Sequence, residues 1–391
     1  MLKILTFTSL FPNTIQPVHG IFVENRLRHL IESGNVTSTV VAPVPWFPSR
    51  HERFRPYSDY AHIPHVEERH GLTIYHPRYP VIPKIGTNLA PLLMYLFVKP
   101  FIAKLIRQGA EFDLIDAHYF YPDGIAAALL GRRFGKPVTI TARGTDINLL
   151  PQYALPRAQI KWAASSVQGM ITVCQALKDE LTALKVDPDR VRVLRNGVDL
   201  EMFRPGNRHT IRKQLNLKGP TLLSVGHLIE RKGHDLVIGA LPKLPDTTLM
   251  IAGAGPERDA LEQQATAIGV HDRVRFLGQI NHDTLRDVYG AADALVLASS
   301  REGWANVLLE AMACGTPVVA TNVWGTPEIV AEHAAGVLMA YRDSAALADA
   351  VKVLFGNLPD RAETRRYAEK FSWDSTTEGQ QALFESIVQR G

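Results

Sequence analysis

Short apolar, β-branched runs alternate with helical patterns along nearly all of the 391 residues. Such alternation is typical of parallel sheets that helices cover on both faces. We interpret the following runs as strands of a first sheet: Lys3–Thr8, Thr37–Pro43, Leu114–Ala117, Val138–Thr141, Met170–Val173 and Val191–Leu194. A second set comprises Thr221–Val225, Thr248–Ala252, Val274–Phe276, Ala294–Leu297 and Val318–Ala320. The expected fold class is therefore α/β.

The pattern is interrupted once, at Arg195-Asn-Gly-Val-Asp199, where Asn-Gly indicates a turn and a polar stretch runs on to Gly219. The chain is long enough for about two domains, each with its own core. We therefore expect two Rossmann-like domains, residues 1–195 and 196–370, whose strand ends face each other across a cleft.

Composition excludes several classes of protein. The chain is 46% apolar and 21% charged, which is ordinary for a globular enzyme. Its two cysteines, Cys174 and Cys314, imply neither a disulfide framework nor a zinc site, which fits a reducing compartment. The N-terminus lacks the pattern of a signal peptide, and the apolar stretch Leu89–Val98 is too short to span a bilayer. We expect a cytoplasmic protein.

Charge is divided unevenly between the two halves. Residues 1–195 hold 23 Lys and Arg against 15 Asp and Glu, whereas the remainder holds 20 against 24. The basic residues around the apolar stretch Leu89–Ile106 are Arg50, Arg53, Arg55, Arg69, Arg78, Lys84, Lys99, Lys104 and Arg107. One interpretation is a peripheral membrane contact through the basic N-terminal domain. The other is a half-buried helix with a solvated basic face. No basic motif interleaved with aromatic residues indicates nucleic acid.

Two glutamates separated by seven residues, Glu302 and Glu310, stand out in the second half. Glu310 lies in the apolar run Val307–Cys314, which predicts a short buried helix ended by Gly315. A carboxylate there needs hydrogen-bond donors, and the vicinal diol of a ribose supplies two. The backbone N–H groups from Gly303 to Val307 come at the helix start and could bind a diphosphate. The alternative is a glutamate favouring the helix dipole plus a satisfied core glutamate.

A cationic loop also follows a strand of the second half. Arg231 and Lys232 come between Gly226 and a helix that begins near His234. Lysine as a point charge and arginine as a planar fork both suit a diphosphate. The alternative is a pair of solvated loop cations. Gly253-Ala-Gly255 is a weak signal because the dinucleotide fingerprint is incomplete.

Strand ends in the first half carry further candidates. His118 ends one strand, where it could hydrogen-bond a sugar hydroxyl, although a lone histidine is equally often structural. Arg143 and Asp146 follow the next strand, with a helix N-cap and a solvated arginine as the alternative. Gly20 follows the first strand and would let the backbone approach a ligand closely, unless it only forms a turn.

Together these segments resemble the family-4 retaining glycosyltransferases, which adopt the GT-B fold. The segments that carry the resemblance are Arg195-Asn-Gly-Val-Asp-x3-Phe203-Arg-Pro205, Gly253-Ala-Gly-Pro-Glu and Glu302-x7-Glu310 with its continuation to Ala320. In the first half, His19-Gly-Ile-Phe-Val23 and His118-Tyr-Phe-Tyr-Pro-Asp-Gly124 are similar to members that build bacterial surface polysaccharides.

The resemblance implies a role for each matching residue. The first domain would bind the acceptor and the second the nucleotide-sugar, with the terminal segment 371–391 crossing back onto the first. The implied catalytic residues are His118, Arg231, Lys232 and Glu302. The implied donor-binding residues are Gly20, Arg231, Lys232, Phe276, Leu277, Glu302, Gly303, Trp304, Ala305, Asn306, Val307 and Glu310. Arg143 and Asp146 would contact the acceptor.

Two positions depart from the family pattern. His227 stands where many members have Arg, so Arg231 is expected to take over that phosphate contact. Arg143 stands where many members have His, which puts the acceptor contacts there in doubt.

The expected reaction transfers a sugar from a nucleotide-sugar to a hydroxyl of a glycan or lipid-linked acceptor, with retention of configuration, in polysaccharide or glycolipid biosynthesis. We expect no metal and no cofactor, the nucleotide-sugar being a substrate. The rival interpretations are a nucleotide-sugar epimerase and a non-catalytic nucleotide-sugar-binding protein on the same fold.

Overall fold

The computed structural model describes residues 1–55, 57–81 and 86–390. Lys84 and Gly391, which the sequence analysis included, lie outside the described residues. The chain forms two compact units. Unit 1 comprises Met1–Asn196 with the C-terminal segment from Asp374, and unit 2 comprises Gly197–Trp373.

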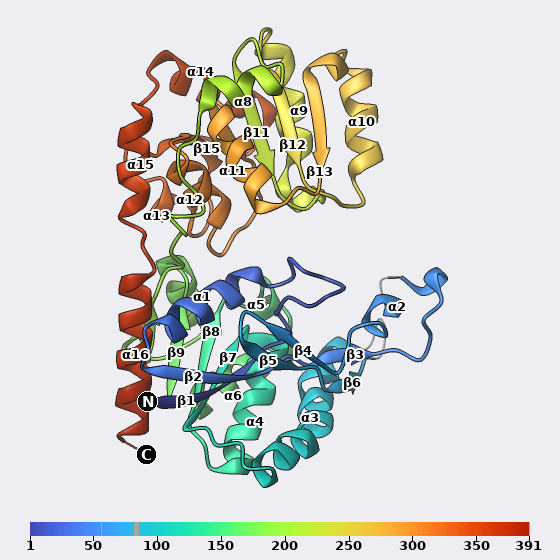
Figure 1. The fold of residues 1–391 in the computed structure, drawn as a ribbon, viewed down its shortest axis with the longest axis vertical. Coiled ribbons are helices and arrows are strands. Elements are labelled where there is room, and N and C mark those ends of the chain that lie inside the picture. The colour runs from blue at the N-terminus through green and yellow to red at the C-terminus, as the bar shows by residue number, and fades with distance from the viewer. Residues whose placement is uncertain (56, 82–85, 391) are drawn as a thin grey trace. The chain divides into compact units, whose positions relative to one another are not determined.

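Unit 1 is built on an eight-stranded sheet in the order β10-β9-β8-β7-β1-β2-β5-β4 (Figure 1). Its strands are parallel except for the antiparallel β4–β5 pair. Their bounds are β1 Leu2–Phe7, β2 Val36–Val41, β4 Val66–Arg69, β5 Leu72–Tyr75, β7 Leu114–His118, β8 Val138–Ala142, β9 Gly169–Thr172 and β10 Val191–Val193. A separate two-stranded sheet pairs β3 (Val44–Trp46) with β6 (Arg78–Pro80).

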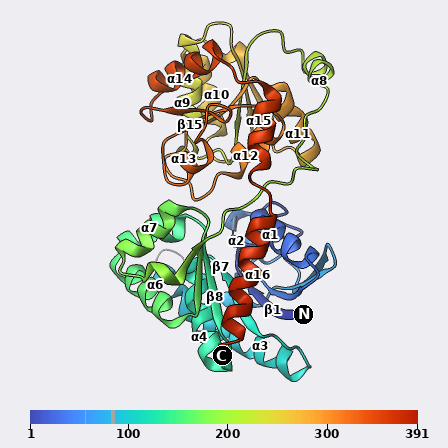
Figure 2. The same ribbon diagram turned by 90° about the vertical axis from the view of Figure 1, so that its left-hand side faces the viewer.

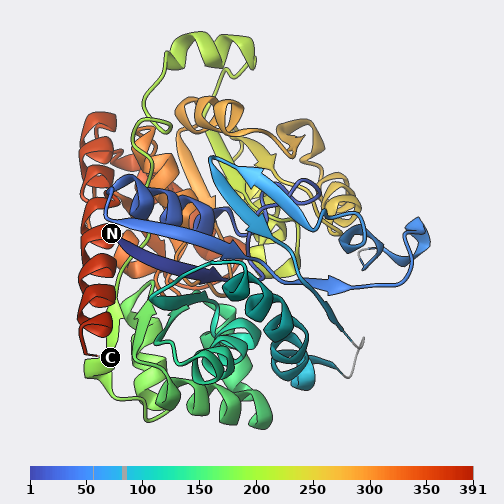
Figure 3. The ribbon, with the colours of Figure 1, turned by 60° about the horizontal axis from the view of Figure 1, so that its bottom comes forward.

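Helices cover both faces of this sheet. Those of unit 1 are α1 Ile21–Glu32, α2 Tyr57–Tyr60, α3 Ala90–Arg107, α4 Ile125–Phe134, α5 Thr145–Asn148, α6 Ala154–Ser166, α7 Gln175–Ala183 and α16 Asp374–Val388. The C-terminal helix α16 packs beside α1, far from it in sequence (Figure 2). On the other face, α3 lies beside α4 (Figure 3).

Unit 2 contains a six-stranded parallel sheet in the order β13-β12-β11-β14-β15-β16. Its strands are β11 Thr221–Val225, β12 Thr248–Ala252, β13 Val274–Gly278, β14 Ala294–Leu297, β15 Val318–Thr321 and β16 Gly336–Met339. Its helices are α8 Arg208–Gln214, α9 His234–Ala240, α10 Arg258–Ala267, α11 His282–Ala291, α12 Asn306–Ala313, α13 Thr326–Ile329, α14 Ser344–Gly356 and α15 Arg361–Glu369.

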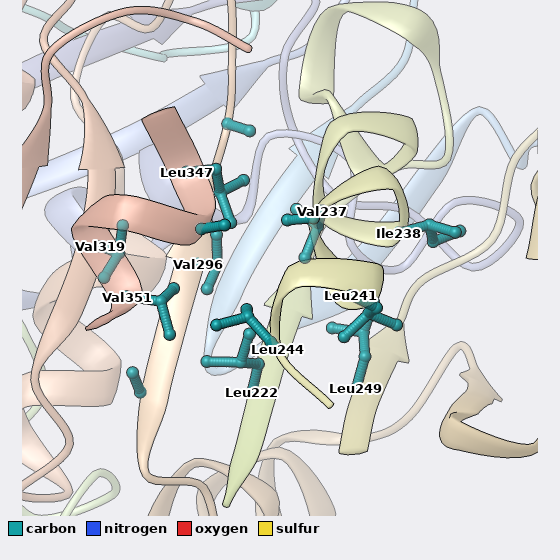
Figure 4. Close-up of a cluster of buried hydrophobic side chains, with 14 of the residues drawn as sticks. Leu222, Val237, Ile238, Leu241, Leu244, Leu249, Val296, Val319, Leu347 and Val351 are labelled. Atoms are coloured by element: carbon teal, nitrogen blue, oxygen red, sulfur yellow. The ribbon is translucent and has the colours of Figure 1, made fainter. Parts of the chain in front are cut away.

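The core of unit 2 lies between one face of this sheet and the helices α9 and α14. Figure 4 shows Leu222 and Leu249 of the sheet packed with Val237 of α9 and Leu347 of α14, all fully buried. Burying such side chains contributes about 1.5–3 kcal/mol each, so this layer holds the strand ends in place.

Glycines let the strand-end loops of unit 2 lie against one another. Gly253 has φ +150°, and a Cβ there would meet the carbonyl oxygen of Gly226 at 1.8 Å. A Cβ on Gly255 would meet the carbonyl oxygen of Leu228 at 2.4 Å. Gly-x-Gly in this chain therefore has a packing role, bringing the loops after β11 and β12 together.

The predicted fold class is confirmed, and every predicted strand is present with shifts of a residue or two at its ends. The helices predicted at Val307–Cys314 and near His234 are present as α12 and α9. The sequence analysis missed β3, β4, β5, β6 and β16. None of the described helices combines the length and the apolar character that a bilayer crossing requires.

The close contact at Gly253 gives a first prediction. We expect Gly253→Ala to lower the free energy of unfolding of unit 2 by about 3 kcal/mol or more, because the added methyl forces the two loops apart. Urea denaturation of the full chain measures the loss. Gly269→Ala is the matched control, since Gly269 has φ +69° but no atom within 4 Å of an added Cβ. It should cost about 1 kcal/mol, and equal losses in the two variants would contradict the packing argument.

Candidate functional site

The cationic loop of unit 2 is held by a glycine turn. Glu230–Lys232 form a single 3₁₀ turn that ends at Gly233, which has φ +70° and caps α9. A Cβ on Gly233 would meet the carbonyl oxygen of Ala298 at 2.3 Å, so the loop packs tightly against the end of β14. Its backbone is also tied to the loop after β14, because Ser300 N donates to the Arg231 carbonyl at 2.9 Å. The cations are thereby fixed beside Glu302.

Lys232 and Glu302 form an ion pair at the centre of this arrangement. Lys232 Nζ donates to Glu302 Oε1 at 2.6 Å, and Arg231 Nη1 lies 3.8 Å from the same oxygen. Glu302 is only 9% exposed, and its burial opposes ionisation. The charges of Lys232 and Arg231 outweigh that effect and hold the pKa of Glu302 below its ordinary value. The three predicted residues therefore lie together, with Glu302 ionised at neutral pH.

Glu310 has a different environment on α12. Its Oε2 accepts a hydrogen bond of 2.8 Å from the hydroxyl of Tyr289, a fully buried residue of α11. Burial raises the pKa of Glu310 to about 7, which the hydrogen bond from Tyr289 only partly offsets. Glu310 is thus a half-buried carboxyl group that lacks the partner cation of Glu302 and titrates near neutral pH.

The segment between the two glutamates leads directly into α12. Trp304 and Ala305 are buried, and Trp304 packs near Phe371 with 6.1 Å between ring centroids. The helix begins at Asn306, and its N-cap Ala305 has no side chain that could accept from the helix amides. The start of α12 therefore keeps the polarity that suits an anion. Anion binding by Gly303–Val307 stays a prediction.

Phe276 and Leu277 lie in the edge strand β13 and are half-buried. The guanidinium of Arg258, at the start of α10, lies 4.2 Å from the centroid of the Phe276 ring. This stacking covers one face of the ring. Binding of the nucleotide-sugar donor by these residues stays a prediction.

In unit 1, the backbone at Gly20 adopts a conformation that favours glycine. It has φ +68° at the N-cap of α1, and a Cβ there would meet the Leu10 carbonyl at 2.3 Å. A side chain would separate the loop after β1 from α1, so the close approach of chain segments alone requires glycine here.

His118 is buried in a polar network. Arg143 Nη2 lies 2.6 Å from His118 Nδ1, and because guanidinium is only a donor, that nitrogen accepts. The ring proton is therefore on Nε2, which faces Asp116 Oδ2 at 3.2 Å. Burial, opposed by Asp116, lowers the pKa of His118 to about 4. In this structure both ring nitrogens have protein partners, so a sugar contact would require one of them to be exchanged.

The network continues to the C-terminal helix. Gln380 of α16 donates from Nε2 to Asp116 Oδ2 at 3.0 Å and accepts at Oε1 from Arg26 Nε at 2.7 Å. Thr139 of β8 donates to the other Asp116 oxygen at 2.8 Å. Gln380, Arg26 and Asp116 are each at most 1% exposed. The sequence analysis missed these partners, because their spacing in the chain gives no sign of the contact.

Arg143 and Asp146 differ in how completely other protein groups satisfy their hydrogen bonds. Asp146 is fully buried and accepts from the backbone N–H groups of Phe120, Arg143 and Gly144 at 2.7–3.3 Å. It thereby shapes the loops after β7 and β8. Arg143 donates to Asn196 and His118, while its Nε has no hydrogen-bond partner among the described residues. This Nε is also shielded from solvent, so a ligand could reach it only if the surrounding side chains moved. Contact of either residue with an acceptor stays a prediction.

Among the described residues, no three His, Cys, Asp or Glu side chains gather as a metal site would need. Cys174 and Cys314 are both buried and are not joined in a disulfide. Neither finding tests the expectation about metals or cofactors.

The link through Gln380 gives the second prediction. We expect Gln380→Ala to lower the free energy of unfolding by about 1–3 kcal/mol, because it leaves Arg26 and Asp116 with unmet buried hydrogen bonds. Chemical denaturation checks this value. The neighbouring Gln381→Ala removes only exposed contacts, with Glu385 and Asn35, and should change stability by less than about 0.5 kcal/mol.

A titration of His118 provides a second readout of the same network. Its ordinary pKa of 6.5 falls to about 4 in the folded chain, so the unfolded chain binds the proton more readily. This histidine therefore lowers the free energy of unfolding as pH falls from about 6.5 toward 4. NMR of the imidazole nitrogens should find a neutral ring with its proton on Nε2 at pH values above this window. A ring that is charged near neutral pH would contradict the assignment.

Family models match most of the chain. "Glycosyltransferase Family 4" matches residues 20–202, and "Glycosyl transferases group 1" matches residues 207–371. The chain is 31% identical over 360 residues to TuaC of Bacillus subtilis, a protein assigned to teichuronic acid biosynthesis as a glycosyltransferase. That match covers 90% of this chain and 88% of TuaC. The chain is also 36% identical over 311 residues to the D-inositol 3-phosphate glycosyltransferase of Mycobacterium leprae, covering 73% and 72% of the two chains.

Solved structures show the same fold. Sucrose-phosphate synthase from Thermosynechococcus elongatus aligns over 100% of both chains with a TM-score of 0.79 at 21% identity. HepE of Anabaena, solved in complex with UDP-glucose, aligns over 100% of both chains with a TM-score of 0.71 at 21% identity. The GT-B fold is thereby confirmed. With the sequence matches, these findings show that the chain belongs to the family-4 glycosyltransferases.

Proposed function

We propose that the protein transfers a sugar from a nucleotide-sugar to an acceptor hydroxyl with retention of configuration, in polysaccharide or glycolipid biosynthesis. The observation that carries this proposal is the buried ion pair of Lys232 with Glu302, which has Arg231 beside it. It places two cations and one carboxylate at a single position, where a diphosphate and sugar hydroxyls could be bound together.

The cations match the charge that develops in such a reaction. Negative charge would grow on the departing diphosphate, and the proposed binding position puts that diphosphate beside Lys232 and Arg231. Because the backbone of this loop is already held by Gly233 and the Ser300 hydrogen bond, only the Lys232 side chain would have to turn from Glu302 toward that charge. Preorganised donors of this kind are worth about 3–4 kcal/mol each, and they could fill the role that a divalent cation has elsewhere.

The two glutamates suit neutral partners. Glu302 is ionised and can accept from donor-sugar hydroxyls once Lys232 turns to the diphosphate. Glu310 already accepts from one hydroxyl, that of Tyr289, so it is placed to accept from a ribose diol as well. Both carboxylates are engaged by protein groups. We therefore favour a front-face route, in which the leaving phosphate accepts the acceptor's proton, over attack by a carboxylate nucleophile.

Two relatives support the choice of substrates. HepE was solved with UDP-glucose, which supports a nucleotide-sugar as donor. TuaC is assigned to teichuronic acid biosynthesis, which supports a glycan acceptor. We propose that the acceptor is a lipid-linked glycan. The epimerase and the non-catalytic alternatives are not favoured, because the matched relatives named here are glycosyltransferases.

The third prediction concerns Lys232. We expect Lys232→Ala to lower kcat/KM for nucleoside diphosphate release from a panel of nucleotide-sugars by about 100-fold or more, because a preorganised cation is lost. Lys243→Ala, an exposed lysine of the same unit, should leave this rate unchanged.

Removal of Lys232 also leaves Glu302 without its close partner, which could unfold the site. The double variant Lys232→Met/Glu302→Gln removes both charges, so it leaves no unpaired buried carboxylate. Low activity in this variant would therefore reflect loss of the site's charges and not unfolding caused by an unpaired Glu302. NMR of the product formed by the wild-type chain gives the anomeric configuration. Full activity of the lysine variant would exclude the proposed diphosphate site, and an inverted product would exclude a retaining reaction.

The fourth prediction concerns Glu310 and pH. Its pKa of about 7 is raised by burial, and hydroxyl donors of a ribose favour the ionised form. Affinity for a nucleotide-sugar should therefore rise as pH increases through about 7. Calorimetric titration at pH values on either side measures this change, with the donor chosen by a thermal-shift screen. Glu310→Gln should bind more weakly and show no such rise. A pH dependence that persists in this variant would assign the titration to another group.

A further inference from the structure

Helix α3 is apolar on both of its sides. Its inner side buries Met94, Val98 and Ile102 completely. The large apolar side chains exposed on the helix and at its N-cap are Leu89, Leu92, Leu96, Phe97 and Ile106, which are 36–52% exposed. A helix that is apolar all round is normally covered on every side. The described residues cover this outer side only in part, and α3 itself lies at the periphery of unit 1 (Figures 1 and 3).

The exposed apolar surface extends to the start of α6. Gln159 Nε2 donates to the carbonyl oxygen of Asn88 at 3.3 Å, which places α6 beside the N-terminal end of α3. Leu155 lies one turn before Gln159 on α6 and is 48% exposed. We call Leu89, Leu92, Leu96, Phe97 and Leu155 the leucine-rich surface.

The two helices that form this surface carry charge of one sign. The sequence contains no Asp or Glu from residue 69 to residue 110 or from residue 147 to residue 178. The cations on the two helices are Lys99, Lys104 and Arg107 of α3 with Arg157 and Lys161 of α6. A soluble surface that combines exposed leucines with cations alone is unusual, since surface charges are ordinarily mixed in sign.

We propose that the leucine-rich surface docks on the headgroup region of an anionic lipid bilayer. Apolar side chains would enter the interface, and the flanking cations would lie near lipid phosphates. A second copy of this chain fits less well, because two surfaces that carry only cations repel one another. The biological role of this contact rests on the proposed function, because it would bring the enzyme to a lipid-linked acceptor. The contact itself does not depend on that function.

The surface differs from the basic cluster at Arg50, Arg53 and Arg55. Arg55 lies 3.3 Å from Asp59 and 3.5 Å from Glu52, so acidic neighbours reduce its attraction for an anionic surface. The guanidinium of Arg53 stacks on Phe54 at 4.6 Å. The acid-free helix α3 is therefore the better place for membrane contact.

Flotation of the full chain with lipid vesicles tests the proposal without donor or acceptor. Vesicles of phosphatidylcholine alone are compared with vesicles that also contain phosphatidylglycerol. We expect the wild-type chain to float with the anionic vesicles at low salt. The triple variant Leu92→Gln/Leu96→Gln/Phe97→Gln should lower the partition coefficient more than tenfold, because the inserting side chains are lost. The variant Lys99→Gln/Lys104→Gln/Arg107→Gln should also bind more weakly and lose the salt dependence.

Tyr341→Gln/Val353→Gln is the matched control, since these side chains of unit 2 are 75% and 63% exposed. It should float as the wild type does, and all variants should melt at the wild-type temperature. Absence of wild-type flotation, or flotation unchanged by the leucine substitutions, would overturn the proposal. A wild-type dimer that these substitutions dissociate, without vesicle binding, would assign the surface to self-association. Nucleotide release by the triple variant should match the wild type, so failure of membrane binding and failure of sugar transfer are distinguishable.

Discussion

The need to satisfy charge buried at the carboxyl ends of parallel strands governs both units. In unit 2, Glu302 follows β14 and meets Lys232, which follows β11. In unit 1, His118 of β7 lies between Asp116 of the same strand and Arg143, which follows β8. An isolated buried charge would cost several kcal/mol, so each strand end requires its neighbour to be in register. The polar groups that could act on a substrate are thus the same ones that fix the strand-end loops.

The C-terminal segment takes part in both arrangements. Arg365 of α15 donates to the carbonyl oxygens of Phe203 and Ala313, tying the chain that enters unit 2 to the end of α12. Gln380 of α16 then bonds Asp116 in the polar network of unit 1. Both contacts join residues more than fifty positions apart. The final helices therefore support the candidate site residues of each unit as well as closing the fold.

Much of this could be predicted from the sequence, because buried parallel strands are continuous apolar runs and most candidate residues lie at their ends or in the segments that follow them. The missed strands lack that signal. β4 contains Glu67, Glu68 and Arg69, and it turns into β5 through His70 and Gly71, both with positive φ. β3 and β6 each contain a proline in three residues. The partners Tyr289 and Gln380 could not be predicted either, since contacts between distant helices depend on the packing of the whole unit.

The protonation states of Glu302 and Glu310 could not be predicted from residue identity alone. Both are removed from water, which by itself raises the pKa of a carboxyl group. Two cations reverse this effect at Glu302, whereas the single Tyr289 hydroxyl at Glu310 does not. One carboxyl group is therefore held ionised, and the other changes charge near neutral pH. In the function proposed above, the first carboxylate would keep its negative charge throughout, whereas the second would ionise when hydroxyl donors of the ligand arrive.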